Sequence, residues 1–337
     1  MRTALQLIIV ATVSLLLSCK GGGERLYKET RTALYTVTSV TVVSSSPEKA
    51  QDAIEAAFAE MERLGSLLNF YSDESELSLI NRKAGVEAVK ASDDTMEIMG
   101  KAVFASEQTD GAFDPTVGPV VKLWDFQEKR IPDEKSIREK VKEIGYRHIV
   151  LDKEKGTVYL DRKGMQIDLG GIVKGFAADK AVAVLRREGI SSGIVSVGGE
   201  VRAFGKRPDG EMWNVGVKNP RQQGSDDELI AAVRLLDRAA STSGDYEKFF
   251  EKDGTRYHHI LDPKTGYPVS LCRSVTVIAP EAAMTDAFAT GVFVLGPQKG
   301  LALLKKLDFE GIIVGSDGAI LVTDGLKDKV TWFGKKS

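Results

Sequence analysis

The residues best suited to chemistry lie in one stretch, 256–290. His258 and His259 are two of the three histidines in the chain, and they precede a turn that begins at Asp262. A β-rich run follows, and then a segment of helical character in which Asp286 and Thr290 are four residues apart, so that both face the same way. A neutral imidazole can accept a proton, and carboxylate and hydroxyl oxygens are ligands for hard cations.

Each of these residues also has an ordinary structural interpretation. Asp-Pro-Lys-Thr-Gly from Asp262 is good hairpin-turn chemistry in any protein. A threonine within a helix, such as Thr290, often bonds only to a backbone carbonyl. Asp286, which we expect in the first turn of its helix, is a favourable partner for the helix dipole. The stretch alone therefore leaves its function open.

Three further segments have unusual backbone requirements. Residues 111–119 hold two prolines and two glycines, which predicts a shaped loop rather than regular structure. From Asp168, a strand, a Gly-Gly turn and a helix through Phe176 follow one another, and unpaired N–H groups at such a helix N-terminus favour phosphate. Gly198 and Gly199 predict a primed hairpin turn.

Hydrophobic periodicity predicts the fold class. Residues 32–44 alternate as a strand does, and Ser46 and Pro47 start a segment whose apolar residues recur at helical spacing. Helices mixed with hairpin-linked strands continue to the C-terminus. This pattern favours an α+β fold with mixed, largely antiparallel sheets packed with helices.

The first residues predict export and anchoring. A short apolar run ending in small residues is typical of a signal peptide, here residues 1–18. Cys19 follows Leu-Leu-Ser, which looks like a bacterial lipobox whose thiol is lipidated. We expect a lipidated cysteine and tether at 19–31 and a catalytic domain at 32–337. The lipid would anchor the protein in a bacterial cell membrane.

Composition narrows the remaining possibilities. The 337 residues carry 46 basic and 48 acidic side chains, so no strong positive field favours nucleic acid as a partner. Cys19 and Cys272 are the only cysteines, and lipidation of the first leaves no intrachain disulfide. The mature chain must therefore be stabilised by a hydrophobic core.

Several motifs together resemble the FAD:protein FMN transferases, the ApbE family. They are Gly-Ala-Phe-Asp-Pro-Thr-Val-Gly-Pro at Gly111, Asp-Leu-Gly-Gly-Ile-Val-Lys-Gly at Asp168, Val-Gly-Gly-Glu at Val197, Ser-Thr-Ser-Gly-Asp-Tyr at Ser241, His-Ile-Leu-Asp-Pro-Lys-Thr-Gly at His259 and Thr-Asp-Ala-Phe-Ala-Thr at Thr285. The resemblance implies an ApbE-like (T-fold-like) domain in a lipoprotein that faces the periplasm. It also implies a magnesium-dependent enzyme that moves FMN from FAD onto a Ser or Thr hydroxyl of an acceptor protein and releases AMP.

The resemblance also implies roles for individual residues. The metal would be held by the Gly171 carbonyl, Asp286 and Thr290, with His259 and Asp262 at catalytic positions. FAD would contact Leu34, Tyr71, Ala112, Phe113, Asp114, Lys174, Gly198, Gly199 and Glu200, with the flavin near Tyr71 and Phe113 and the phosphates near Lys174. The family usually carries Met-Gly-Thr where this chain has Leu34-Tyr35-Thr36, and tyrosine is far bulkier than glycine.

Two other functions fit the same residues. A magnesium-dependent FAD pyrophosphatase would use water in place of the acceptor hydroxyl and release FMN and AMP. A flavin-binding lipoprotein without chemistry would hold FAD for storage or delivery. Asp286, Thr290 and His259 together favour an enzyme over simple storage.

Overall fold

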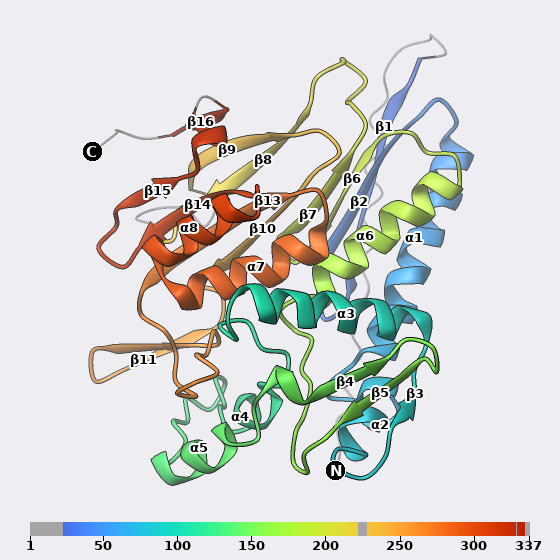
Figure 1. Ribbon diagram of the computed structural model, residues 1–337. Coiled ribbons are helices and arrows are strands. Elements are labelled where there is room, and N and C mark those ends of the chain that lie inside the picture. Colours follow the sequence, from blue (N-terminus) through green and yellow to red (C-terminus); the bar gives the residue numbers. More distant parts are fainter. Residues whose placement is uncertain (1–22, 222–227, 328, 334–337) are drawn as a thin grey trace, which may run out of the picture.

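A central antiparallel sheet with helices on one face dominates the fold (Figure 1). The structure is a computed structural model, and it describes residues 23–221, 228–327 and 329–333. The predicted signal peptide and Cys19 lie outside this range. Among the described residues, no helix is both long and apolar enough to cross a membrane.

The central sheet has eight strands in the order β1-β2-β6-β7-β10-β13-β14-β15, and each neighbouring pair is antiparallel. The strands are β1 (Arg25–Ala33), β2 (Thr36–Ser44), β6 (Gly193–Val197), β7 (Glu200–Phe204), β10 (Ala239–Gly244), β13 (Cys272–Ala279), β14 (Glu310–Gly315) and β15 (Ile320–Val322). Together with the helices, this sheet confirms the predicted α+β class.

Alternation along the strands divides the apolar residues between two cores. Val277 of β13 faces the helices, whereas Ile278 faces a second, three-stranded sheet on the opposite side. The helices are α1 (Pro47–Leu67), α3 (Asp93–Gln108), α6 (Val173–Arg187), α7 (Ala282–Leu295) and α8 (Pro297–Lys306). The second sheet has the order β16-β9-β8, made of β8 (Trp213–Lys218), β9 (Leu229–Leu235) and β16 (Val330–Trp332).

Smaller elements complete the described part of the chain. They are α2 (Glu76–Arg82), β3 (Val89–Lys90), α4 (Gly118–Val121), α5 (Glu134–Val141), η1 (Tyr146–His148), β4 (Ile149–Asp152), β5 (Thr157–Leu160), β11 (Phe249–Lys252), β12 (Thr255–His258) and η2 (Asp324–Leu326). β3, β5 and β4 form a small sheet, and β11 pairs with β12. A third apolar cluster, which includes Trp124 and Phe250, packs α4 and α5 against this hairpin.

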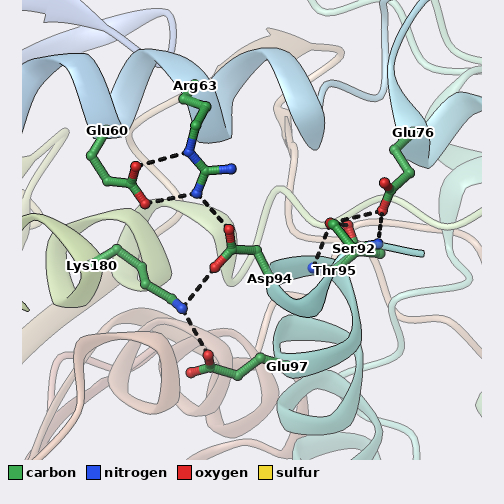
Figure 2. Close-up of polar contacts among 8 residues, drawn as sticks. All are labelled: Glu60, Arg63, Glu76, Ser92, Asp94, Thr95, Glu97 and Lys180. Atoms are coloured by element: carbon green, nitrogen blue, oxygen red, sulfur yellow. Dashed lines mark hydrogen bonds and ion pairs between the residues drawn. The ribbon is translucent and has the colours of Figure 1, made fainter. Parts of the chain in front are cut away.

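Charged side chains tie three helices together (Figure 2). Asp94 at the start of α3 accepts hydrogen bonds from Arg63 of α1 at 2.5 Å and from Lys180 of α6 at 2.7 Å. Burial would raise the pKa of Asp94, but these two cations hold it below its usual range. Arg63 also binds Glu60, and Lys180 also binds Glu97. The network fixes α6, whose N-terminus belongs to the candidate site.

The first strand corrects the predicted tether. Residues 25–31 were expected to be flexible, but they form most of β1, which pairs with β2 along its whole length. The charged side chains that suggest a solvated linker instead cover the edge of the sheet. The Arg31 guanidinium lies 4.5 Å from the centre of the Phe58 ring of α1 and also contacts Glu29 and Glu55. Long polar side chains with an apolar stem suit such a half-buried strand.

Candidate functional site

The site is organised by the N-terminus of α6, where it meets α7. Helix α6 follows the turn at 168–172 and has no side-chain N-cap. The Gly175 N–H donates instead to Oδ2 of Asp286 on α7, at 3.0 Å. A Cβ at Gly175 would lie 2.1 Å from the Ala282 carbonyl oxygen, so only glycine allows the two helices to approach this closely.

The position of Asp286 corrects one sequence expectation. It is the fifth residue of α7, one turn further into the helix than predicted. The first turn is capped by Asp179 of α6, whose two carboxylate oxygens accept from the N–H groups of Ala282 and Ala283 at 3.0 and 2.9 Å. Asp286 is therefore not engaged as a cap of its own helix, and its carboxylate is directed to the α6 terminus.

A half-buried ammonium lies beside two buried carboxylates. Nζ of Lys174, the second residue of α6, lies 2.5 Å from Oε1 of Glu200 at the start of β7. Burial raises the pKa of Glu200 to about 8, and the charge of Asp286 adds to this shift although Lys174 opposes it. Burial likewise raises the pKa of Asp286. Within the described chain, Oε2 of Glu200 has no hydrogen-bond partner. The cluster can accept further positive charge.

The three predicted metal ligands come from two segments that pack together, the turn before α6 and helix α7. A Cβ at Gly171 would lie 3.3 Å from Oγ1 of Thr290, so this turn and α7 are in contact. Oγ1 of Thr290 lies 3.2 Å from Oγ of Ser243 on β10. Backbone, hydroxyl and carboxylate oxygens suit magnesium, which often uses one or two carboxylates. The described residues contain no group of three or more His, Cys, Asp or Glu side chains placed to hold a metal, so a cation here would depend on backbone and hydroxyl oxygens beside Asp286.

The two adjacent histidines have different environments, as their alternation predicts. His258 is buried, its Nε2 lies 2.7 Å from the Val269 carbonyl oxygen, and its Nδ1 accepts from the Ile260 N–H. His259 reaches solvent. Protein packed around this exposed imidazole displaces part of its hydration, which lowers the pKa of His259, and nearby positive charges, Lys248 among them, lower it further. His259 is thus a neutral imidazole at pH 7.

Asp262 forms its turn. Its carbonyl oxygen accepts from the N–H groups of Thr265 and Gly266, and its Oδ1 accepts from the Lys264 N–H at 2.8 Å. These contacts match the ordinary turn chemistry of the sequence. The turn holds the segment after His259 in place, and a catalytic role for Asp262 stays a prediction.

Comparison with known protein families identifies the family of this chain. A model described as the ApbE family matches residues 34–313, which is most of the chain. The chain belongs to the ApbE family. The matched region includes all the site residues described above.

Individual ApbE relatives match over nearly their full length. A protein of Treponema pallidum (strain Nichols) named FAD:protein FMN transferase is 34% identical over 333 residues, covering 93% of this chain and 91% of the relative. The crystal structure of the ApbE protein from Thermotoga maritima superposes with a TM-score of 0.83 at 35% identity, covering 90% of this chain and 99% of that one. The apo form of the Pseudomonas stutzeri flavinyl transferase ApbE gives 0.80 at 28% identity, covering 91% and 97%.

The other ApbE positions predicted to contact FAD differ in exposure. Tyr71 is exposed, and Gly198 and Gly199 form an exposed two-residue turn between β6 and β7, as predicted. Leu34 is half-buried and packs near Gly65 of α1.

The predicted loop at Ala112, Phe113 and Asp114 is buried behind the site. Asp114 accepts from Thr116 and from the Tyr146 N–H, so its carboxylate is used within the protein. Phe113 supports Gly171, because its ring would lie 3.3 Å from a Cβ there. These buried side chains support the site, and a direct contact between this loop and FAD stays a prediction.

Two charged residues at the ApbE site were not among the predicted site residues. Asp168 accepts from the Gly170 N–H at 2.8 Å; burial raises its pKa, and the charge of Lys248 opposes that rise. The Lys248 carbonyl accepts from the His259 N–H at 3.1 Å, which holds the two residues together. The only sequence signal for Asp168 was its place before the Gly-Gly turn. Lys248 had none, because its position depends on the pairing of β11 with β12.

Proposed function

We propose that this chain is an FAD:protein FMN transferase that links FMN to a Ser or Thr hydroxyl of an acceptor protein. The convergence of Lys174, Asp286 and Thr290 on the N-terminus of α6 supports this proposal most directly. A positive helix end and an ammonium suit a pyrophosphate, and hard oxygen ligands suit the cation that accompanies one. A relative that matches nearly the whole chain carries the name FAD:protein FMN transferase, which agrees with transfer of FMN to a protein.

The reaction would proceed by displacement at the FMN-side phosphorus of FAD. The acceptor oxygen forms a new P–O bond, the bridging P–O bond breaks, and AMP leaves with the bridging oxygen. His259 would take the proton of the attacking hydroxyl, since its imidazole is neutral and reaches solvent, where a protein acceptor can approach. Lys174 would stabilise negative charge on the phosphates.

The donor set fits magnesium. The Gly171 carbonyl, the Asp286 carboxylate and the Thr290 hydroxyl would hold the ion beside Lys174. When bound, magnesium would neutralise charge on the pyrophosphate. Asp286 supplies the only carboxylate of the set, and its hydrogen bond from Gly175 fixes its orientation.

Product analysis tests the proposal. The protein is incubated with FAD, magnesium and a mixture of exported proteins, then denatured and separated on a gel. We expect flavin fluorescence on acceptor bands, AMP in solution, and neither when the enzyme is omitted. Free FMN with AMP and no labelled protein would favour the pyrophosphatase. Stable FAD binding without AMP would favour a storage protein.

The pH dependence of the reaction should reflect the low pKa of His259. A base is active when neutral, and a pKa of about 4 keeps the neutral form dominant down to about pH 5. We expect kcat/KM for AMP release to stay level from pH 7 to about 5.5 and to fall as the pH approaches 4. Circular dichroism at each pH would check that the fold persists. A loss centred near pH 6.5 would show that His259 titrates as an ordinary histidine.

We also propose that the mature protein is attached to a bacterial membrane through a lipid on Cys19 and faces the periplasm. The support is the apolar run followed by Leu-Leu-Ser-Cys. Replacing Cys19 by alanine should abolish incorporation of labelled palmitate, while a fragment starting at Glu24, just before β1, keeps its activity. Palmitate labelling of the alanine variant would contradict the proposal.

A further inference from the structure

Three two-residue hairpin turns in the described chain have both residues at positive φ. They are Leu34 (48°) and Tyr35 (60°) between β1 and β2, Gly198 (61°) and Gly199 (103°) between β6 and β7, and Asp253 (51°) and Gly254 (74°) between β11 and β12. Gly-Gly and Asp-Gly are the residue pairs that such turns favour. Leu-Tyr is not, because a Cβ is strained in this region of φ and ψ.

Packing explains one of the two strained residues. The Leu34 side chain lies 3.5 Å from a Cβ position at Gly65 of α1 and packs against the main core. Tyr35, in contrast, is 85% exposed, so burial does not compensate for its backbone strain. Uncompensated strain of this kind is concentrated at functional sites.

The Tyr35 side chain is nevertheless anchored. Its hydroxyl oxygen accepts a hydrogen bond of 2.8 Å from Nδ2 of Asn69. Oδ1 of the same asparagine accepts from the Tyr71 N–H at 2.9 Å. One amide therefore connects two exposed tyrosines, Tyr35 and Tyr71, of which Tyr71 is 78% exposed.

The turn formed by Leu34 and Tyr35 lies at the rim of the candidate site. On one side, the Gly198 N–H donates to the Val37 carbonyl at 3.0 Å, and a Cβ at Gly198 would lie 2.7 Å from Oγ1 of Thr36. The strand after Gly199 begins with Glu200, the partner of Lys174. On the other side, Tyr71 is close enough to Asp168 for the negative charge of that carboxylate to help burial raise the pKa of the Tyr71 hydroxyl.

We propose that Tyr35 is a specificity-determining residue whose ring stacks against the isoalloxazine of FAD. This inference rests on the proposed function. An exposed aromatic face that is fixed through its hydroxyl can stack on a planar ring with little loss of side-chain freedom. The flavin end of FAD is assigned rather than the adenine end because Asn69 holds Tyr35 together with Tyr71, the position that the family resemblance assigns to the flavin, while Lys174 would contact the phosphates.

The test compares three variants with the wild type. Tyr35→Gly removes the ring and suits the positive φ, Tyr35→Phe keeps the ring without its hydroxyl, and Asp253→Gly makes the same kind of turn substitution at the free end of the β11–β12 hairpin. Dissociation constants for FAD, FMN and ADP are measured for each, together with Tm. FMN lacks adenine and ADP lacks flavin, so the two ligands distinguish the ends of FAD.

We expect Tyr35→Gly to weaken FAD and FMN binding by about 10-fold, to leave ADP binding unchanged, and to keep or raise Tm. Tyr35→Phe should weaken FAD binding by about 3-fold or less, and Asp253→Gly should not change it. Equal FAD affinity in Tyr35→Gly and the wild type, a loss confined to ADP, or a loss that follows a fall in Tm would each overturn the inference. A wild type that binds FAD without releasing AMP would contradict the proposed function alone.

Discussion

Replacing Asp286 by asparagine is expected to slow FMN transfer by roughly 1000-fold, the upper end of the effect of removing one stabilising group from a preorganised site. The asparagine side chain can still accept the Gly175 N–H, so α6 and α7 should stay in contact. It lacks the negative charge that would hold magnesium beside Lys174. The rate is measured as AMP release in the presence of an acceptor, and Tm is measured alongside.

A titration of flavin fluorescence separates metal binding from direct contact with FAD. In magnesium, Asp286→Asn should bind FAD more weakly than the wild type, and in EDTA its affinity should not fall. Thr290→Val keeps a branched side chain of similar size but removes the hydroxyl, which is a neutral ligand. It should show the same pattern with a smaller effect. Equal weakening of Asp286→Asn in both buffers would show that the carboxylate does not act through a metal.

Replacing His259 by alanine should slow transfer by roughly 100-fold or more, the usual effect of losing a positioned base. FAD affinity should change little, because the imidazole is proposed to act on the acceptor hydroxyl. The change should therefore appear in kcat. Single-turnover measurement with saturating FAD isolates this step.

His148→Ala provides the matched control for this variant. His148, at the end of η1, pairs with Asp161, which follows β5, and is not among the residues assigned to the site, so its loss should leave transfer unchanged. His258 is a poorer control, because both of its ring nitrogens are bonded inside the protein and its loss should lower Tm. Similar rate losses for His259→Ala and His148→Ala would contradict the role given to His259.

Local signals in the sequence predicted the elements whose structure depends on neighbouring residues. Ser46 caps α1 by accepting from the Lys49 N–H, and Pro47 occupies its first turn. The Gly198-Gly199 turn and the opposite environments of His258 and His259 also follow from local rules, namely turn chemistry and the alternation of strand residues.

Features that depend on distant partners could not be predicted in the same way. The charged β1 looked like a linker because its stabilising partners, β2 and Phe58, are supplied by pairing and packing. The cap of α7 comes from Asp179, about a hundred residues earlier in the chain. Asp286 was expected in the first turn of this helix, but it lies beyond the residues that Asp179 caps. Lys248 reaches the site only through a hairpin outside the recognised motifs.

The bond formed on the acceptor tests the central claim most directly. After reaction with FAD and magnesium, the labelled acceptor is digested and its flavin-bearing peptide is fragmented by mass spectrometry, while AMP is quantified in the same sample. Transfer by displacement at phosphorus predicts a Ser or Thr that carries FMN less one water, with one AMP released per adduct. An adduct that retains the adenylate, a flavin attached through its ring, or AMP released without any adduct would contradict the account.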